Sequence, residues 1–203
     1  MMNSSHPTKV LLIQTTVALI KSRPMAEVTI DLVLSESGIS KGSLYHHFAD
    51  FADLIEQAEV AIFVDQADIS LNDLQEILEK SHSRDEFLVR IRTLTHRNMG
   101  AEQTESRLTR IQGIAISSGH ERMAKAMGEV QLRKTEGVAD LFRAAKERGW
   151  SNNDLDPYAV ALFVQSYNIG AVIDTFTPNQ MDFAGWLLLI DLILSEVILQ
   201  QGE

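Results

Sequence analysis

Apolar residues recur at intervals of three and four positions along nearly the whole chain. Phe87, Leu88, Ile91 and Leu94 show this spacing, which places side chains on a single face of an α-helix. No segment shows a convincing period-two alternation of a half-buried strand, and no Asn-Gly hairpin turn occurs. The sequence therefore predicts an all-α protein.

Capping residues, prolines and glycines divide this pattern into about nine or ten helices. Thr29, Ser40 and Asp50 each stand where a side-chain oxygen can accept a hydrogen bond from a first helical turn. Asp156 followed by Pro157 marks another helix start. The expected helices cover, approximately, residues 7–21, 30–37, 41–48, 50–63, 71–79, 83–94, 102–117, 120–148, 157–176 and 182–200.

The chain carries 18 Lys and Arg against 28 Asp and Glu, a formal net charge of −10. An acidic total argues against nucleic-acid binding, because phosphate binding usually requires an excess of basic residues. The acidity is confined to residues 49–82 (net −8) and 151–203 (net −7), whereas residues 1–48 carry +1 and residues 83–150 carry +4. Charge therefore permits DNA binding by the N-terminal 48 residues. The stretch 49–82 is most simply a solvated face, and a second interpretation is that it repels DNA.

The chain contains no cysteine, which excludes disulfides, thiolate zinc sites and iron–sulfur clusters. Residues 1–7 lack the basic and apolar layout of a secretory signal. The uncharged run Phe183–Ile190 is far shorter than the roughly 18–20 residues of a membrane span. We expect a cytoplasmic protein that makes no membrane contact.

Two C-terminal helices, 157–176 and 182–200, are apolar around most of their circumference. Between Trp186 and Leu199 only Asp191, Ser195 and Glu196 are polar. Such helices must be covered on several sides, either by the protein's own core or by a second subunit. We expect them to form the seam of a homodimer, two helices from each subunit.

Residues 29–54, TIDLVLSESGISKGSLYHHFADFADL, hold the strongest functional pattern. They form two short expected helices joined by a glycine-centred turn at 37–40, as in a helix-turn-helix unit. Small residues at the start of the second helix let its N-terminal N–H groups approach phosphate. Leu44 and Phe48 can anchor this helix inward, which leaves polar side chains outward for bases and phosphates. The pattern alone is also compatible with an αα corner that binds no DNA.

The same residues resemble the DNA-binding domain of TetR-family transcriptional regulators. The similar motifs are Ser-Lys-Gly-Ser, Leu-Tyr-His-His-Phe and Asp-x-x-Asp-Leu after the glycine turn, and the resemblance covers residues 8–55. It implies a three-helix DNA-binding domain at 1–50 and a larger helical bundle for ligand binding and dimerisation at 51–203. Beyond residue 55 the chain resembles the family only in length, helix count and the apolar closing pair.

The resemblance also implies which residues contact DNA. Thr29 would touch phosphate from the start of the second helix. Those that would face DNA from the third helix are Ser40, Lys41, Gly42, Ser43, Tyr45, His46 and His47. Tyr45 could instead be partly buried, and the two histidines could be ordinary exposed side chains. The chain departs from the family at Phe51, where a phosphate-binding lysine is common, and at Leu34, where alanine is usual.

A bundle built from residues 83–176 could hold a ligand between its helices. The candidate lining residues are Phe63, Ile91, Thr95, Asn98, Met123, Met127, Phe163 and Tyr167. Because their spacing is helical, each of them could equally be ordinary core. His96 and Arg97 lie beside this stripe and could bind an anionic or carbonyl group, although an exposed ion pair is simpler for Arg97. We expect a small, mainly apolar effector that could carry one polar end.

No pattern indicates an enzyme. Glu79 and His82 have the spacing of a di-iron helix, but the second Glu-x-x-His that such a site needs is missing. No Ser-His-Asp set, glycine-rich phosphate loop or His-Glu-x-x-His stands out. We expect no catalytic activity, no cofactor and no metal.

These features together predict a homodimeric, ligand-responsive DNA-binding regulator, a repressor rather than an activator, that leaves a near-palindromic operator when its effector binds. One alternative is a helix-turn-helix regulator without a small-molecule effector, controlled by abundance or by a protein partner. Another is a purely structural helical dimer.

Overall fold

The computed structural model of the chain describes residues 6–117, 119 and 121–200. Within these residues it contains nine α-helices and no strand, which confirms the all-α prediction. The helices are α1 (Pro7–Ser22), α2 (Ile30–Ser37), α3 (Lys41–His47), α4 (Phe51–Lys80), α5 (Arg84–Met99), α6 (Thr104–Ser117), α7 (Glu121–Glu147), α8 (Pro157–Gly170) and α9 (Phe183–Leu192). Short 3₁₀ turns cover Met25–Glu27, Ala101–Gln103 and Ile173–Phe176, and a π-helical segment, Ile193–Ile198, continues α9.

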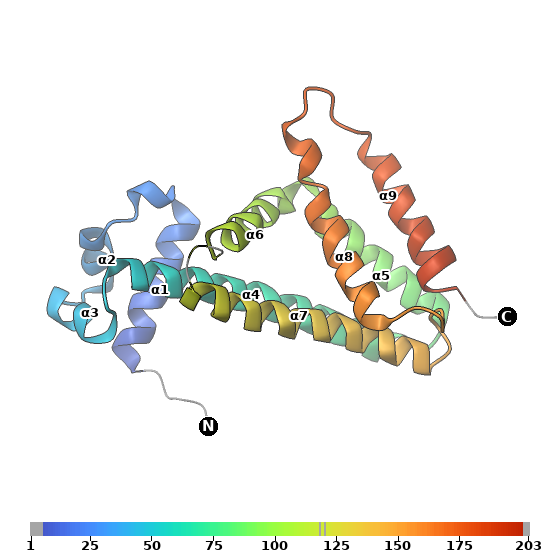
Figure 1. The fold of residues 1–203 in the computed structure, drawn as a ribbon, viewed down its shortest axis with the longest axis horizontal. Helices are drawn as coiled ribbons and strands as arrows, with labels where there is room; N and C mark the ends of the chain where they lie inside the picture. The colour runs from blue at the N-terminus through green and yellow to red at the C-terminus, as the bar shows by residue number, and fades with distance from the viewer. Residues whose placement is uncertain (1–5, 118, 120, 201–203) are drawn as a thin grey trace.

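Figure 1 shows an elongated molecule with α1–α3 at one end and α5, α8 and α9 at the other. The two longest helices, α4 and α7, run side by side between these ends, and α6 lies above them. The first part of α4 thus belongs to the N-terminal helices and the remainder to the larger bundle.

The helix boundaries depart from the sequence prediction in three places. Residues 50–63 and 71–79 do not form separate helices, because no glycine or proline interrupts residues 64–70 and α4 continues through them. The helix expected over 157–176 ends at Gly170 and is followed by a 3₁₀ turn. The helix expected over 182–200 changes to a π-helix at Ile193. Residue 120, where we expected a helix to begin, lies outside the described residues, and α7 is described from Glu121.

The N-terminal helices share one apolar core. Leu12 of α1, Val33 of α2 and Leu44 of α3 are fully buried in it, and so is Leu54 of α4. Burial of such side chains contributes about 1.5–3 kcal/mol each. A division of the chain between residues 50 and 51 stays a prediction, since the first turns of α4 pack in this N-terminal core.

Basic residues of the larger bundle bind backbone carbonyls at the ends of helices. The Arg84 Nε donates to the carbonyl oxygen of Leu199 (2.6 Å), and the Arg148 Nη1 donates to that of Leu78 (3.1 Å). Carbonyls in a last helical turn lack an intrahelical donor, so these bonds satisfy groups that would otherwise need water. Part of the positive charge of residues 83–150 therefore stabilises the bundle itself.

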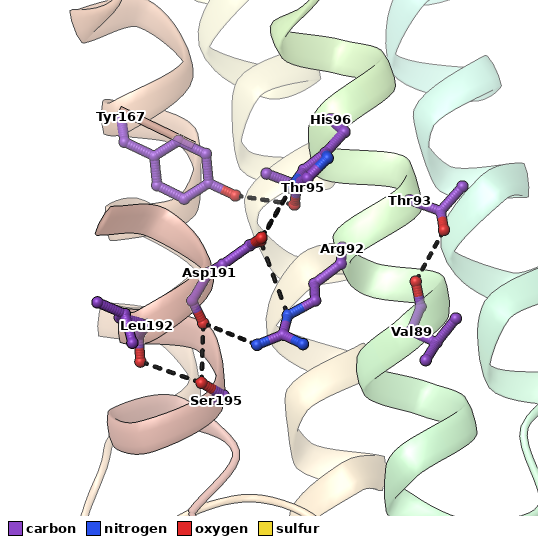
Figure 2. Close-up of polar contacts among 9 residues, drawn as sticks. All are labelled: Val89, Arg92, Thr93, Thr95, His96, Tyr167, Asp191, Leu192 and Ser195. Atoms are coloured by element: carbon purple, nitrogen blue, oxygen red, sulfur yellow. Dashed lines mark hydrogen bonds and ion pairs between the residues drawn. The ribbon is translucent and has the colours of Figure 1, made fainter. Parts of the chain in front are cut away.

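The single carboxylate within the apolar helix α9 fastens that helix to α5. The Asp191 carboxylate lies 3.1 Å from His96 Nε2 and 3.7 Å from Arg92 Nε, as Figure 2 shows. In the same part of α5, the hydroxyls of Thr95 and Tyr167 are 3.3 Å apart and join α5 to α8.

Residues 157–176 are long and apolar enough to cross a membrane by length and composition, with a mean hydropathy of 1.3. The α-helix within this stretch, however, ends at Gly170. Its Val160, Ala161 and Tyr167 side chains are buried against the other helices of the bundle. The stretch is therefore built as a bundle helix.

Candidate DNA-binding site

A tight turn joins α2 to α3. Gly38 has a φ of +67°, a left-handed conformation that costs glycine little and most other residues more. Its N–H donates to the Leu34 carbonyl oxygen (3.0 Å), which ends α2. The Ser37 hydroxyl accepts a bond from the Ile39 N–H (3.3 Å) and completes the turn. The glycine-centred turn expected from the sequence is thus present.

Two hydroxyl side chains cap the helices of this unit. The Thr29 Oγ1 accepts a hydrogen bond from the Leu32 N–H at the start of α2, and the Ser40 Oγ accepts one from the Ser43 N–H at the start of α3, both at 3.3 Å. Each hydroxyl uses its oxygen as acceptor in the cap, so its proton can still be donated to a phosphate oxygen. Thr29 and Ser40 are both exposed.

The third helix separates its side chains as predicted. Leu44 is fully buried and Phe48 is 2% exposed, whereas Lys41 and His46 lie on the outside. Tyr45 is 47% exposed, so it is not partly buried in the core. A Cβ atom added at Gly42 would meet nothing within 4 Å, so protein packing does not require glycine there. The missing Cβ atom of Gly42 instead leaves room for another molecule to approach the start of α3 closely.

Three histidines lie together beside this outer face. The rings of His46 and His47 are 5.1 Å apart and those of His6 and His47 are 4.8 Å apart. Partial burial lowers the pKa of His47, and the basic neighbours His6, His46 and Lys9 lower it further. The neutral form of His47, which can both donate and accept a hydrogen bond, is therefore favoured.

The two departures from the family pattern are explained by packing. Phe51 is partly buried and packs against the N-terminal core, as does Leu34. Phe51 therefore adds apolar area where a lysine would add charge. Nearby, the Lys9 ammonium lies 5.4 Å from the centre of the Phe48 ring, in a cation–π contact.

Two aspartates fix the junction between α3 and α4. The Asp53 N–H donates to Asp50 Oδ1 (2.8 Å), and the Ala49 N–H donates to Asp53 Oδ2 (2.9 Å), a reciprocal capping arrangement. Burial opposes the charge of Asp53, but hydrogen bonds from Gln57 and from the Ala49 amide hold the pKa of this carboxyl below its ordinary value. The outer face of α3 is thus oriented directly by the start of α4.

One arginine connects this junction to the larger bundle. Arg122, in the first turn of α7, lies 3.6 Å from the Asp53 carboxylate and 3.3 Å from that of Glu56. Helix α7 is therefore linked by these ion pairs to the residues that orient α3.

The eight residues expected to line a ligand cavity lie in separate parts of the bundle and do not line one common cavity. Phe63, Met123 and Met127 share a cluster between α4 and α7. Ile91 and Tyr167 belong to the main bundle core, and Thr95 is hydrogen-bonded to Tyr167. Phe163 is 39% exposed and stacks edge-on against Tyr167, and Asn98 is partly buried with its carbonyl bound by Arg107. His96 and Arg97, the two polar candidates, are paired with Asp191 and Asp73.

Two hollows lie near these residues. A groove of about 590 Å³ runs along the outside of α4 and α5 and is crossed by the Arg97–Asp73 ion pair. A second, small hollow of about 10 Å³ lies between α4, α6 and α7, large enough for about one water molecule. Its lining residues are Phe63, Gln66, Ala67, Arg110, Val130, Gln131 and Lys134.

The polar residues that line this hollow were not among the residues predicted from the sequence. The Arg110 Nη2 donates to the side-chain oxygens of Gln131 and Gln165, both at 2.9 Å, and Gln165 also donates to Thr135 (3.0 Å). A usable signal was present, because Lys134 interrupts the apolar stripe of α7 at a position that the helical spacing assigns to the interior.

The sequence is similar to those of known regulatory proteins. Residues 12–58 match the family model described as bacterial regulatory proteins, tetR family. The HTH-type transcriptional regulator UidR of Escherichia coli is 22% identical over 174 residues, which covers 86% of this chain and 84% of UidR.

Solved structures share the whole fold. One is a Mesorhizobium loti protein assigned to the TetR family of transcriptional regulators, at a TM-score of 0.67 and 19% identity, covering 93% of this chain and 94% of that one. Another is a Saccharomonospora viridis protein assigned as a transcriptional regulator, in complex with choline, at a TM-score of 0.66 and 17% identity, covering 95% of this chain and 98% of that one.

The family model covers the turn, the caps and the outer face of α3, and the related folds extend over the remaining helices. Residues 12–58 therefore belong to the tetR family of bacterial regulatory proteins, and the remaining helices share the fold of solved proteins assigned to that family.

Proposed function

We propose that the protein is a homodimeric repressor that binds a near-palindromic operator and is released from it by a small, mainly apolar effector. The observation that carries the DNA-binding part is the outer face of α3, where Lys41, Tyr45 and His46 stand exposed above the buried Leu44. Its place of action would be the cytoplasm, where bacterial DNA lies, and its role would require no catalysis.

The outer face offers distinct chemistry to the backbone and to the bases of DNA. The hydroxyls of Thr29 and Ser40 and the Lys41 ammonium suit phosphate oxygens, because all three can donate a hydrogen bond. Ser43, Tyr45, His46 and His47 carry donors and acceptors that suit base edges, and Gly42 permits close approach. Two such units in one dimer would contact half-sites about 34–36 Å apart, or a multiple of that distance.

The dimer would form through the exposed apolar side chains of α8 and α9. These helices lie at the end of the molecule remote from α1–α3 (Figure 1). The exposed side chains are Leu162 (46%) and Phe163 (39%) on α8, Leu188 (61%), Leu189 (48%) and Leu192 (49%) on α9, and Val197 (47%) on the π-helical segment that continues α9. An apolar surface of this extent is typical of a protein interface rather than of a solvated face.

The release would be a population shift transmitted by α4. This helix contributes Leu54 to the N-terminal core and Phe63 and Ala67 to the cluster against α7, so a movement of α7 or α4 changes the position of α3. Arg122 adds an ionic link at the same junction. An effector that binds the moved arrangement more tightly than the DNA-binding arrangement would lower the affinity for DNA. The difference between its two binding free energies sets the size of this effect, typically about 1–3 kcal/mol.

Two observations bear on the effector. The Saccharomonospora viridis protein holds choline in a chain of the same fold, which supports a ligand-binding bundle. The small hollow of about 10 Å³ instead favours the alternative of a regulator without a small-molecule effector, unless the bundle opens.

Removal of the outer side chains of α3 should weaken DNA binding and leave the dimer intact. The operator is first selected from randomised DNA with the wild-type protein. Tyr45→Ala and Lys41→Ala should each raise the Kd by at least about 5- to 150-fold, the range for the loss of one base or phosphate contact, because each substitution removes a contact from both half-sites. Fluorescence anisotropy measures the Kd, and light scattering measures the mass of each variant.

Lys80→Ala is the matched control for Lys41→Ala. Lys80 is also exposed, but it lies in the last turn of α4, at the far end of the helix from α3. This control should bind DNA as the wild type does. Normal binding by both Tyr45→Ala and Lys41→Ala would show that α3 is not the DNA-contacting helix.

The salt dependence of DNA binding should be shallow for a dimer of this kind. Few basic residues lie near α3, and Phe51 replaces the common lysine, so few counterions are released on binding. We expect a slope of log K against log salt between about −2 and −4, and Phe51→Lys should steepen it by about 2, one phosphate for each subunit. A wild-type slope of about −6 or steeper would contradict this account.

Charges placed on the apolar face of α9 should dissociate the dimer. Light scattering of the wild type should give twice the chain mass of 22.7 kDa. The variant that combines Leu188→Glu with Leu192→Glu should give the mass of one chain. Val89→Glu is the control, because Val89 is 60% exposed on α5, almost as much as Leu188. A monomeric wild type, or a double variant that stays dimeric, would refute this seam.

A further inference from the structure

A lysine stands on the inward face of α7 among apolar residues. Met127, Val130 and Val138 are each at most 8% exposed, and Lys134 lies between Val130 and Val138 at the spacing of four residues that defines this face. It lines the small hollow between α4, α6 and α7. A lysine at such a position forgoes apolar burial and brings a charge into the bundle.

Arg110 of α6 brings a second positive charge to the same space. Its guanidinium is hydrogen-bonded to Gln131 and Gln165, whose side-chain oxygens are uncharged. Gln165 itself is 6% exposed and is held by Thr135. These bonds orient the guanidinium but leave its charge uncompensated.

Among the described residues, neither cation has a carboxylate partner. The other residues that line the space are Phe63, Gln66 and Ala67 from α4 and Val130 and Gln131 from α7, and none of them is charged. The exposed neighbour Arg133, by contrast, is paired with Asp68 at 2.7 Å. The protein therefore pairs a surface arginine of α7 and leaves two interior cations without an anion.

Burial and the positive charge of Arg110 both act on the pKa of Lys134. Burial, together with the positive charge of Arg110, lowers the pKa of Lys134 from its ordinary value to about 7. Burial also lowers the pKa of Arg110. Two like charges in a poorly solvated interior repel each other, and an anion between them would stabilise both.

We propose that the effector carries an anionic group, a carboxylate, which binds Arg110 and Lys134 in the interior of the bundle. The inference rests on the proposed ligand response and specifies the polar end of the effector. The two Nη2 hydrogens of Arg110 are donated to Gln131 and Gln165, so its Nη1 would donate to the carboxylate, and Lys134 supplies the opposing point charge. The cluster of Phe63, Met123 and Met127 beside the space would contact the apolar remainder.

The bundle must open to admit such a molecule, because the space now holds about 10 Å³. Helix α6 is the element most easily displaced. Among its described residues only Gly113 and Ser117 are buried, so few apolar contacts are lost when it moves. Entry of the anion would therefore move α6, which carries Arg110, relative to α4 and α7.

The test measures binding of matched acids and amides to the full-length wild-type chain by isothermal titration calorimetry. The probes are the straight-chain carboxylates from butanoate to dodecanoate, benzoate, the primary amide of each, and choline. At least one acid should bind, and its amide should bind at least about 30-fold more weakly, the factor that corresponds to about 2 kcal/mol. Choline should not bind, because its charge has the same sign as those of the two side chains.

Arg110→Met and Lys134→Met should weaken acid binding by a similar factor, and Arg133→Met, the neighbouring surface variant, should leave it unchanged. Acid affinity of the wild type should also fall as pH rises above about 7, because the carboxylate favours protonated Lys134. This fall should be absent in Lys134→Met, because Arg110 stays charged throughout the range. Should a variant fail to fold, the acid-to-amide ratio and the pH profile of the wild type decide the question.

Absence of binding by every acid, equal binding of acid and amide, or undiminished binding by folded Arg110→Met and Lys134→Met would each overturn the anion site. Fluorescence anisotropy of operator binding with and without each compound separates this failure from that of the proposed function. An acid that binds but leaves DNA affinity unchanged keeps the site and removes the ligand response. A neutral compound that releases DNA from both variants keeps the response and removes the anion site.

Discussion

The structure depends on one helix that is buried at both ends in different cores. Helix α4 places Leu54 among the N-terminal helices and Phe63, Ala67 and Ile77 among those of the bundle. Its start is fixed by the capping pair Asp50 and Asp53, which also determines how α3 is presented. Because packed cores resist continuous deformation, the two ends cannot shift independently, and the helix transmits displacement between them.

The charge of the protein follows this division. The acidic residues of 49–82 and 151–203 account for the net −10, while the unit that contacts DNA is nearly neutral. Many basic residues of 83–150 are used internally, as Arg84 and Arg148 show by binding backbone carbonyls. Sequence preference would then come from the hydrogen-bonding groups of α3 rather than from a broad attraction to phosphate.

The local parts of this structure could be predicted from sequence, because caps and turns depend on neighbouring residues. Thr29, Ser40 and Gly38 act at the expected positions, and Leu44 and Tyr45 face inward and outward as expected. The continuity of α4 was missed, because a polar stretch without glycine or proline resembles a break when only apolar spacing is counted.

The interior of the bundle was harder to predict, because it depends on contacts between distant helices. Arg110 meets Gln165 across 55 positions of the chain, and no local pattern encodes that contact. The eight expected lining residues follow helical spacing, which identifies buried faces but does not say which faces enclose a common space. Lys134 was the one local clue, a charge on an otherwise apolar stripe.

The most direct test of the account is amide hydrogen exchange of the full chain with and without its selected operator. The account predicts that DNA slows exchange across residues 29–47, with the largest change at the start of α3, and leaves residues 151–200 unchanged. Slower exchange confined to the C-terminal helices, or no change in α2 and α3 at saturating DNA, would contradict it.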